Sequence, residues 1–277
     1  MIKFFRKIRQ NSLSEGKTGK YLKYAIGEII LVVIGILLAL QINNWNEARK
    51  NRVLEKEYLI RLLEDLEHDQ KDLTQVITNN AINLILAEDA LNKLGADSSI
   101  LLKGQPHKLA YKGVNINNNE VTYKDSLLTT RKFDLKCFGE QITLLTEFRI
   151  FDLTQTTITD LTSTGNIEVI RDKKLRESIQ FYYARMLSAI GNEESILKPH
   201  LDYLIELLKE LGIPPNSRLS DSDLRDLVKN DHRLAMALYS LYDANRTLFN
   251  INYSRKASTY KQIQKIKDEI KAALELI

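Results

Sequence analysis

The feature that most constrains this chain is an apolar run of 18 residues near its N-terminus. From residue 25 to residue 42 the sequence reads AIGEIILVVIGILLALQI, and its strongly polar members are Glu28 near the start and Gln41 near the end. An α-helix of this length spans about 27 Å, which is close to the hydrocarbon thickness of a bilayer. The run lacks the polar stripe that a helix on the surface of a soluble core would carry. It therefore predicts a transmembrane helix over 25–42.

The residues on either side of the run are typical of a membrane anchor. Tyr24 precedes it and Trp45 follows it, so an aromatic residue lies near each expected interface. Seven Lys or Arg residues precede residue 25 against one acid, whereas the basic residues that follow are diluted by glutamates. This bias predicts a cytoplasmic N-terminus, with segment 1–24 against anionic lipid head groups. No small-residue cleavage pattern follows the run, so we expect the anchor to be retained.

Small residues suggest how two anchors could meet. Gly27, Gly35 and Ala39 share one helix face at spacings that are multiples of four, which would let two helices approach closely. A homodimer through the anchor is therefore one expected assembly. Glu28 has two interpretations, because it could be a functional carboxylate within the membrane or could reach water from its place one turn inside the interface.

Charge and composition narrow the remaining possibilities. Segment 1–24 has a net charge of +6, while the whole chain has +4, so the rest of the chain is slightly acidic. A basic nucleic-acid-binding face is therefore not expected. With 44% hydrophobic residues, 11 Gly and 4 Pro among 277 residues, the chain can fold with few breaks in regular structure. We predict an all-α fold in which 43–277 forms one extracytoplasmic helical bundle.

Apolar spacing predicts two long helices in that bundle. The first continues from the anchor to about residue 94, and the second runs from an Asp231 cap to the C-terminus, both with coiled-coil-like rhythm. We expect them to pair antiparallel, which would place the acidic face at 64–72 opposite a set of cations on the second helix. Those cations are Arg246, Arg255, Lys256 and Lys261.

Shorter elements are expected between the long helices. Gly165 suits a left-handed turn and Asp172 suits an N-cap for a helix to about residue 189, while Asn192 suits the cap of the next one. A further helix is predicted over 133–161. The Gly- and Asn-containing stretch 95–125 is predicted to be an irregular loop at the end of the domain far from the membrane.

Two segments together resemble a known family. They are GEIILVVIGILLALQINNWNE from Gly27 to Glu47 and LTSTGNIEVIRDKKLRESIQFYY from Leu161 to Tyr183. The chain is similar in both to uncharacterised single-span membrane proteins of Bacteroidetes-type bacteria. The resemblance implies a bacterial inner-membrane location and a periplasmic domain of unknown function, and it supplies no activity, cofactor or catalytic residue.

The clearest candidate for chemistry is a row of polar side chains in the first long helix. Glu64, His68 and Asp72 recur every four residues, so they share a face and could ligate a divalent metal. The competing interpretation is a solvated or ion-paired acidic face, because one helix alone does not close a metal site. No nucleotide-binding, serine-hydrolase or kinase motif is present, and no catalytic residue or cofactor is assigned.

Three functions remain open on the sequence. The leading interpretation is a membrane-anchored binding or scaffold protein of the cell envelope that presents its distal loop to an unknown protein partner. The second is a small-ligand or metal-sensing domain with a pocket around His68 and Asn252, since helical bundles can hold ligands between their helices. The third is an envelope enzyme.

Overall fold

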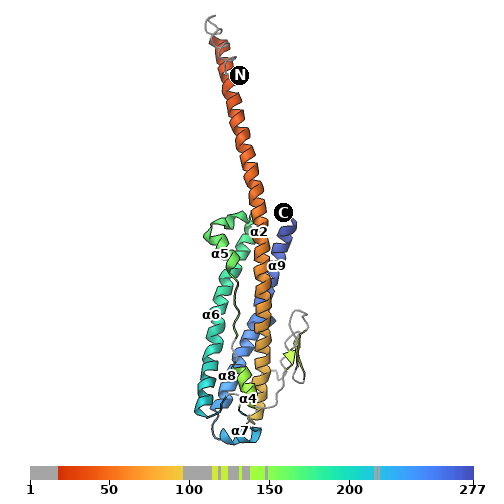
Figure 1. Cartoon of the computed structure of the whole chain (residues 1–277), viewed down its shortest axis with the longest axis vertical. Helices are drawn as coiled ribbons and strands as arrows, with labels where there is room; N and C mark the ends of the chain where they lie inside the picture. Colours follow the sequence, from red (N-terminus) through yellow and green to blue (C-terminus); the bar gives the residue numbers. More distant parts are fainter. Residues whose placement is uncertain are drawn as a thin grey trace. The chain divides into compact units, whose positions relative to one another are not determined.

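The computed structural model describes residues 18–95, 114–117, 120–123, 131–132, 138–146, 149–214, 217 and 219–277. The chain divides into two compact units, Met1–Glu57 and Tyr58–Ile277. The described residues are predominantly helical, as predicted, and three short strands are the exception among them (Figure 1). Most of the basic segment 1–24 lies outside the described residues.

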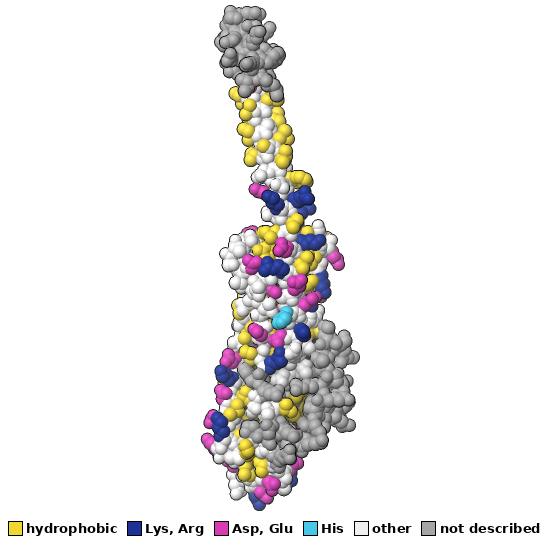
Figure 2. Space-filling view, viewed as in Figure 1, with side chains coloured by type: hydrophobic (Ala, Val, Ile, Leu, Met, Phe, Trp, Pro, Cys, Tyr) yellow, Lys and Arg dark blue, Asp and Glu magenta, His cyan; other side chains and the backbone are white. Residues whose placement is uncertain are grey.

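The first unit holds the apolar part of helix α2, which runs Thr18–Lys93. Its large apolar side chains from Ile26 to Ile42 are between 46% and 66% exposed, so no neighbouring element of the described chain covers them. Figure 2 shows hydrophobic side chains along the visible face of this part of the helix. Length and composition make this helix able to cross a membrane.

The predicted anchor residues lie along this part of α2. A Cβ added at Gly27 or Gly35 would meet no other atom within 4 Å, so both positions are open to a second helix. Trp45 is 67% exposed at the far end of the apolar run. The side chain of Tyr24 lies outside the described residues, and pairing of two anchors stays a prediction.

In the second unit, the remainder of α2 supplies much of the core. Its apolar stripe follows the predicted spacing, and Gly95 adopts a left-handed φ of 64° just after the helix ends. A side chain that reaches this end is Arg225, whose Nη1 donates to the carbonyl of Lys93 at 3.1 Å. The stripe residues that are almost fully buried include Leu59, Leu62, Leu66, Leu73, Val76, Ile77, Leu84, Ala87, Ala90 and Leu91.

Helix α6 spans Lys173–Glu210, so the prediction of two helices divided at Asn192 is wrong. Asn192 lies inside α6, because buried side chains on both sides of it, such as Met186 and Leu197, keep the helix continuous despite Gly191. At its start, the carboxylate of Asp172 accepts hydrogen bonds from the backbone N–H groups of residues 174 and 175.

A turn centred on Gly165 leads into α6. Gly165 has a φ of 72°, and the short 3-10 helix η1, Asn166–Val169, follows it. On η1, Asn166 donates through Nδ2 to the hydroxyl of Tyr58 at 3.1 Å, which ties the turn to α2.

The predicted single C-terminal helix is interrupted. Helix α8 spans Arg233–Phe249, a π-helical turn η2 spans Asn250–Ser254, and α9 spans Thr259–Glu275. Both α8 and α9 pack against α6. The break has a local cause, because the Ser258 hydroxyl accepts from a backbone N–H inside the first turn of α9 and so starts a new helix. The N-cap of α8 is His232, one residue after the predicted Asp231.

The predicted helix over 133–161 is interrupted as well. Helix α4, Phe138–Leu145, and helix α5, Thr156–Ser163, are separated by residues 149–155, which have no helical structure. In that stretch Phe151 and Leu153 are buried and alternate with more exposed positions, which is the pattern of an extended chain. We name residues 149–155 the extended segment.

Short elements complete the second unit. Helix α7, Asp221–Leu227, is capped by the Ser220 hydroxyl. Within the stretch predicted to be irregular, strands β1, Val114–Asn117, and β2, Glu120–Tyr123, pair antiparallel, and β2 also pairs with β3, Arg131–Lys132. The alternation of β-branched or aromatic residues with polar ones accounts for β1 and β2. The other residues of 95–125 lie outside the described ones, apart from Gly95.

Candidate functional site

The candidate metal ligands Glu64, His68 and Asp72 do not come together as a site. Glu64 is exposed, and the His68 ring nitrogen Nδ1 lies 3.1 Å from the Thr154 hydroxyl. Both oxygens of the Asp72 carboxylate already have partners. Among the residues that the structure describes, no group of three or more His, Cys, Asp or Glu side chains could hold a metal ion.

The acidic face of α2 instead binds the extended segment and the first turn of α5. Three aspartates on this face, Asp65, Asp69 and Asp72, are spaced four and three residues apart, and we name them the carboxylate row. Asp69 accepts from the backbone N–H of Thr154 at 2.8 Å, Asp72 from that of residue 152, and Asp65 from that of residue 157 in α5. An extended chain without a neighbouring strand needs such acceptors for its backbone. Asp69 and Asp72 therefore take the place of a β-ladder, while Asp65 supplies an acceptor for the start of α5.

A further carboxylate, on α6, holds the same segment. Glu193 on α6, which is 3% exposed, accepts through Oε2 from the N–H of Phe151 at 3.3 Å. Its Oε1 accepts from Asn252 in the π-helical turn at 2.7 Å, and Asn252 in turn accepts from the Thr259 hydroxyl. Asn252, which was predicted to line a polar pocket with His68, is fully buried in this network.

The cations predicted to face the acidic row have other positions. Arg246 pairs with Asp243 on its own helix, and the Nζ of Lys261 donates to a backbone carbonyl in the loop before α9. The contact between α9 and α2 is made by Lys267, whose Nζ donates to Gln70 at 2.8 Å and lies 3.7 Å from Glu67.

Burial raises the pKa of several acidic groups in this region. Desolvation raises the pKa of Asp69 to about 6, although hydrogen bonds from Thr154 and Tyr182 oppose the shift. Burial likewise raises the pKa of Glu193. Desolvation, and next the charge of Asp69, raise the pKa of Tyr182, so its hydroxyl stays protonated and donates to Asp69.

These shifts predict a pH-dependent stability. Because folding raises the pKa of Asp69 above the value of 3.8 that holds for an unfolded chain, the folded state binds its proton more tightly. The free energy of unfolding should therefore fall as the pH rises from about 4 to about 7, by about 2–3 kcal/mol from Asp69 alone. Glu193 acts in the same direction.

Asp69→Asn tests this prediction, since the amide oxygen can still accept from Thr154 without ionising. We expect the variant to lose most of the Asp69 contribution and to be at least as stable as the natural chain at pH 7. The measurement is urea unfolding of the detergent-solubilised full chain, followed by circular dichroism at pH 5 and pH 7.5. If the free energy of unfolding changes by the same amount between these two pH values in both chains, Asp69 does not titrate in this range.

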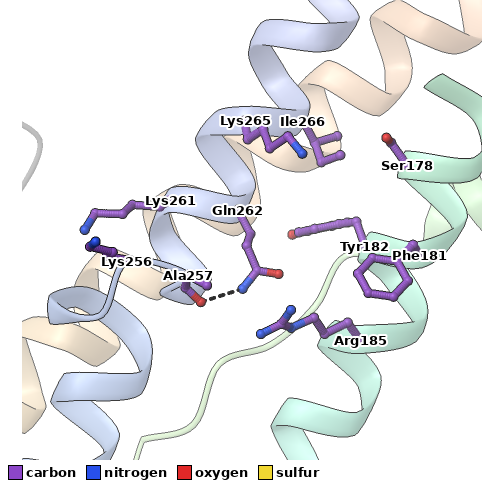
Figure 3. Close-up of a pocket in the computed structure, with 10 residues that line it drawn as sticks. All are labelled: Ser178, Phe181, Tyr182, Arg185, Lys256, Ala257, Lys261, Gln262, Lys265 and Ile266. Carbon is purple, nitrogen blue, oxygen red and sulfur yellow. Dashed lines mark hydrogen bonds between the residues drawn. The ribbon is translucent and has the colours of Figure 1, made fainter. Parts of the chain in front are cut away.

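A groove lies between α6 and α9, on the same side as Tyr182 (Figure 3). Its volume is about 300 Å³, which is at the small end of ligand-binding sites. The hydroxyl of Tyr182 donates to Asp69 at 3.3 Å, so the groove adjoins the carboxylate row. The residues that line it are Ser178, Phe181, Tyr182, Arg185, Lys256, Ala257, Lys261, Gln262, Lys265 and Ile266.

Sequence reasoning missed this groove. Lys256 and Lys261 were assigned to pairing with α2, and Arg185 was not singled out. The signal that could have revealed it is the break between α8 and α9, because the residues of the break bring Lys256 and Ala257 beside α6. A π-helical turn often marks a functional region, but it leaves no simple sequence pattern.

Comparison with known proteins identifies one region. Residues 28–95 match the model of a family of unknown function, DUF6090. No curated protein matches the chain, and no solved structure matches it. The matched range contains most of the apolar run and the whole carboxylate row, whereas the residues that line the groove lie outside it.

Proposed function

We propose that this chain is a single-pass, membrane-anchored binding protein of a bacterial envelope. The observation that carries the proposal is the exposure of every large apolar side chain between Ile26 and Ile42 in an otherwise well-packed protein. Soluble proteins rarely expose so large a continuous apolar surface, whereas a lipid-facing helix requires it. The family match over residues 28–95 covers most of this stretch and also the part of α2 that contributes to the core of the domain.

The proposed orientation has the N-terminus in the cytoplasm and the helical domain in the periplasm. Seven basic residues before residue 25 support it, because positive charge is retained on the cytoplasmic side. The same charges are suited to anionic lipid head groups. The inner membrane is the proposed location because of the resemblance to single-span proteins of Bacteroidetes-type bacteria.

Binding is favoured over catalysis by the way the polar groups are used. The carboxylate row and Glu193 have backbone and side-chain partners within the domain, so they serve to hold the extended segment. The groove between α6 and α9, by contrast, is open and lined by cations. A small-ligand-binding role is therefore the more specific version of the proposal, and a protein scaffold is its alternative.

Fractionation of bacterial cells that express the full chain tests the anchor. We expect the chain in the membrane pellet after an alkaline carbonate wash and its release by detergent alone. Protease added to spheroplasts should remove a C-terminal tag, while a cytoplasmic marker protein stays intact. A chain that remains in the supernatant without detergent would contradict the anchor, and a protected tag would contradict the orientation.

A further inference from the structure

We propose that the groove between α6 and α9 binds a phosphate-bearing small molecule with a planar ring. This inference rests on the proposed binding function, but it does not depend on the membrane anchor. It starts from charge, because four of the ten lining residues are basic and none is acidic. The basic residues are Arg185, Lys256, Lys261 and Lys265.

The charge in the groove is largely unneutralised. Elsewhere on the described surface, cations commonly have a carboxylate partner, as Lys198 has with Glu194 at 3.0 Å. Arg185 and Lys256 have no hydrogen bond or ion pair with any described residue. Of the other two, Lys265 lies 3.6 Å from a glutamate one turn along α9. Cations gathered in a concave site without acids raise the local concentration of anions.

The cation that reaches into the groove is Arg185. Figure 3 shows Arg185 extending from α6 toward Gln262 on α9, whereas the side chains of Lys256 and Lys261 extend away from it at the groove's edge. Gln262 is held in place because its Nε2 donates to the carbonyl of Ala257 at 2.8 Å. The guanidinium of arginine has a planar fork of donors that matches phosphate oxygens.

The start of α9 adds to the same field. Lys256 and Ala257 come directly before Ser258, the N-cap of this 17-residue helix. The N-terminus of a helix carries a partial positive charge, which favours an anion in its vicinity. The N-terminus of α9 and the four basic side chains therefore all favour a bound anion.

An aromatic wall supplies the second part of the proposed ligand. The ring of Phe181 is 67% exposed beside the cations, while Tyr182 and Ile266 are almost buried at the edge of the groove. An exposed phenyl ring next to arginine offers a face on which a planar ring can stack. A nucleotide such as AMP combines both features and is the probe of choice.

Calorimetric titration of the detergent-solubilised full chain tests the proposal. The probes are AMP, inorganic phosphate, adenosine and a short-chain phosphatidylglycerol below its micelle concentration. We expect AMP to bind more tightly than phosphate, adenosine not to bind, and the affinity for AMP to fall with increasing salt. Binding of the short-chain lipid but not of AMP would overturn the proposal, because phosphatidylglycerol carries a phosphate but no planar ring.

Three variants separate the roles of the residues. Arg185→Gln should weaken AMP binding about tenfold or more, since it removes a charged hydrogen-bond donor. Phe181→Ala should weaken AMP binding and leave phosphate binding unchanged. Lys198→Gln removes a charge from α6 outside the groove and should have no effect. All three should retain the circular dichroism spectrum and the membrane fractionation of the natural chain.

Three further results would overturn the inference. They are the absence of binding by all four probes, unchanged AMP affinity in Arg185→Gln, and adenosine binding as tightly as AMP, which would remove the anion from the proposal. None of these results would alter the fractionation experiment, so failure of the groove and failure of the anchor remain distinguishable.

Discussion

Arginine at both residue 33 and residue 37 is expected to move the chain from the membrane fraction to the soluble or aggregated fraction. The variant is Val33→Arg with Leu37→Arg, which puts two charges near the middle of the apolar run and on one helix face. Each arginine at the centre of a membrane helix costs about 2.5–3.5 kcal/mol for insertion, and each apolar residue contributes only a few tenths. Two such charges thus offset most of what the remaining apolar residues supply. Carbonate-washed membranes measure the outcome.

A matched control places the same two charges outside the run. Asn43→Arg with Asn44→Arg adds arginines where a helix already leaves the hydrocarbon, so this variant should stay in the membrane pellet. If the two variants partition alike, the apolar run is not embedded in lipid. Only the recovery of this control in the membrane pellet is measured, because arginines added on this flank also influence the orientation of the helix.

Leu66→Ala is expected to have the largest effect on the stability of the domain. Leu66 is 0% exposed on α2, in the turn between Asp65 and Asp69. Removing a fully buried leucine side chain leaves a cavity and lowers the free energy of unfolding by about 3–5 kcal/mol. Because small domains are stabilised by about 5–15 kcal/mol, this loss is a large share of the total. Urea unfolding followed by circular dichroism measures it.

Leu187→Ala is the control for this experiment. Leu187 lies on α6 and is 50% exposed. The same truncation there should change the free energy of unfolding by less than about 1 kcal/mol. Similar losses at the two positions would show that the core does not lie along α2 as described.

The sequence predicted those features that depend on local pattern. The apolar run, the buried stripe of α2 and the end of that helix at Gly95 all follow from spacing and from the conformational freedom of glycine. The DUF6090 match over residues 28–95 agrees with the predicted resemblance to proteins of unknown function within that range. Asp172 also caps α6 through its own carboxylate, a contact within three residues.

The features that the sequence did not predict depend on contacts between distant residues. The extended segment was predicted to be helical because nothing nearby shows that Asp69 and Asp72 supply acceptors from 85 and 80 residues away. The groove escaped prediction for the same reason, since its two walls come from α6 and α9. Continuity of α6 past Gly191 likewise depends on burial, which local propensity does not report.

The carboxylate row has a consequence for how freely this part of the chain can change. Its aspartates recognise backbone N–H groups, which nineteen of the twenty amino acids provide. Outward-facing positions such as Asp152 and Gln155 can therefore accept a wide range of side chains while the segment keeps its path. Proline is the exception, because it has no backbone N–H and at residues 152, 154 or 157 would remove the group that donates to the row. Variation at the outward-facing positions of this stretch should thus be broad in chemistry, while proline should be missing from residues 152, 154 and 157.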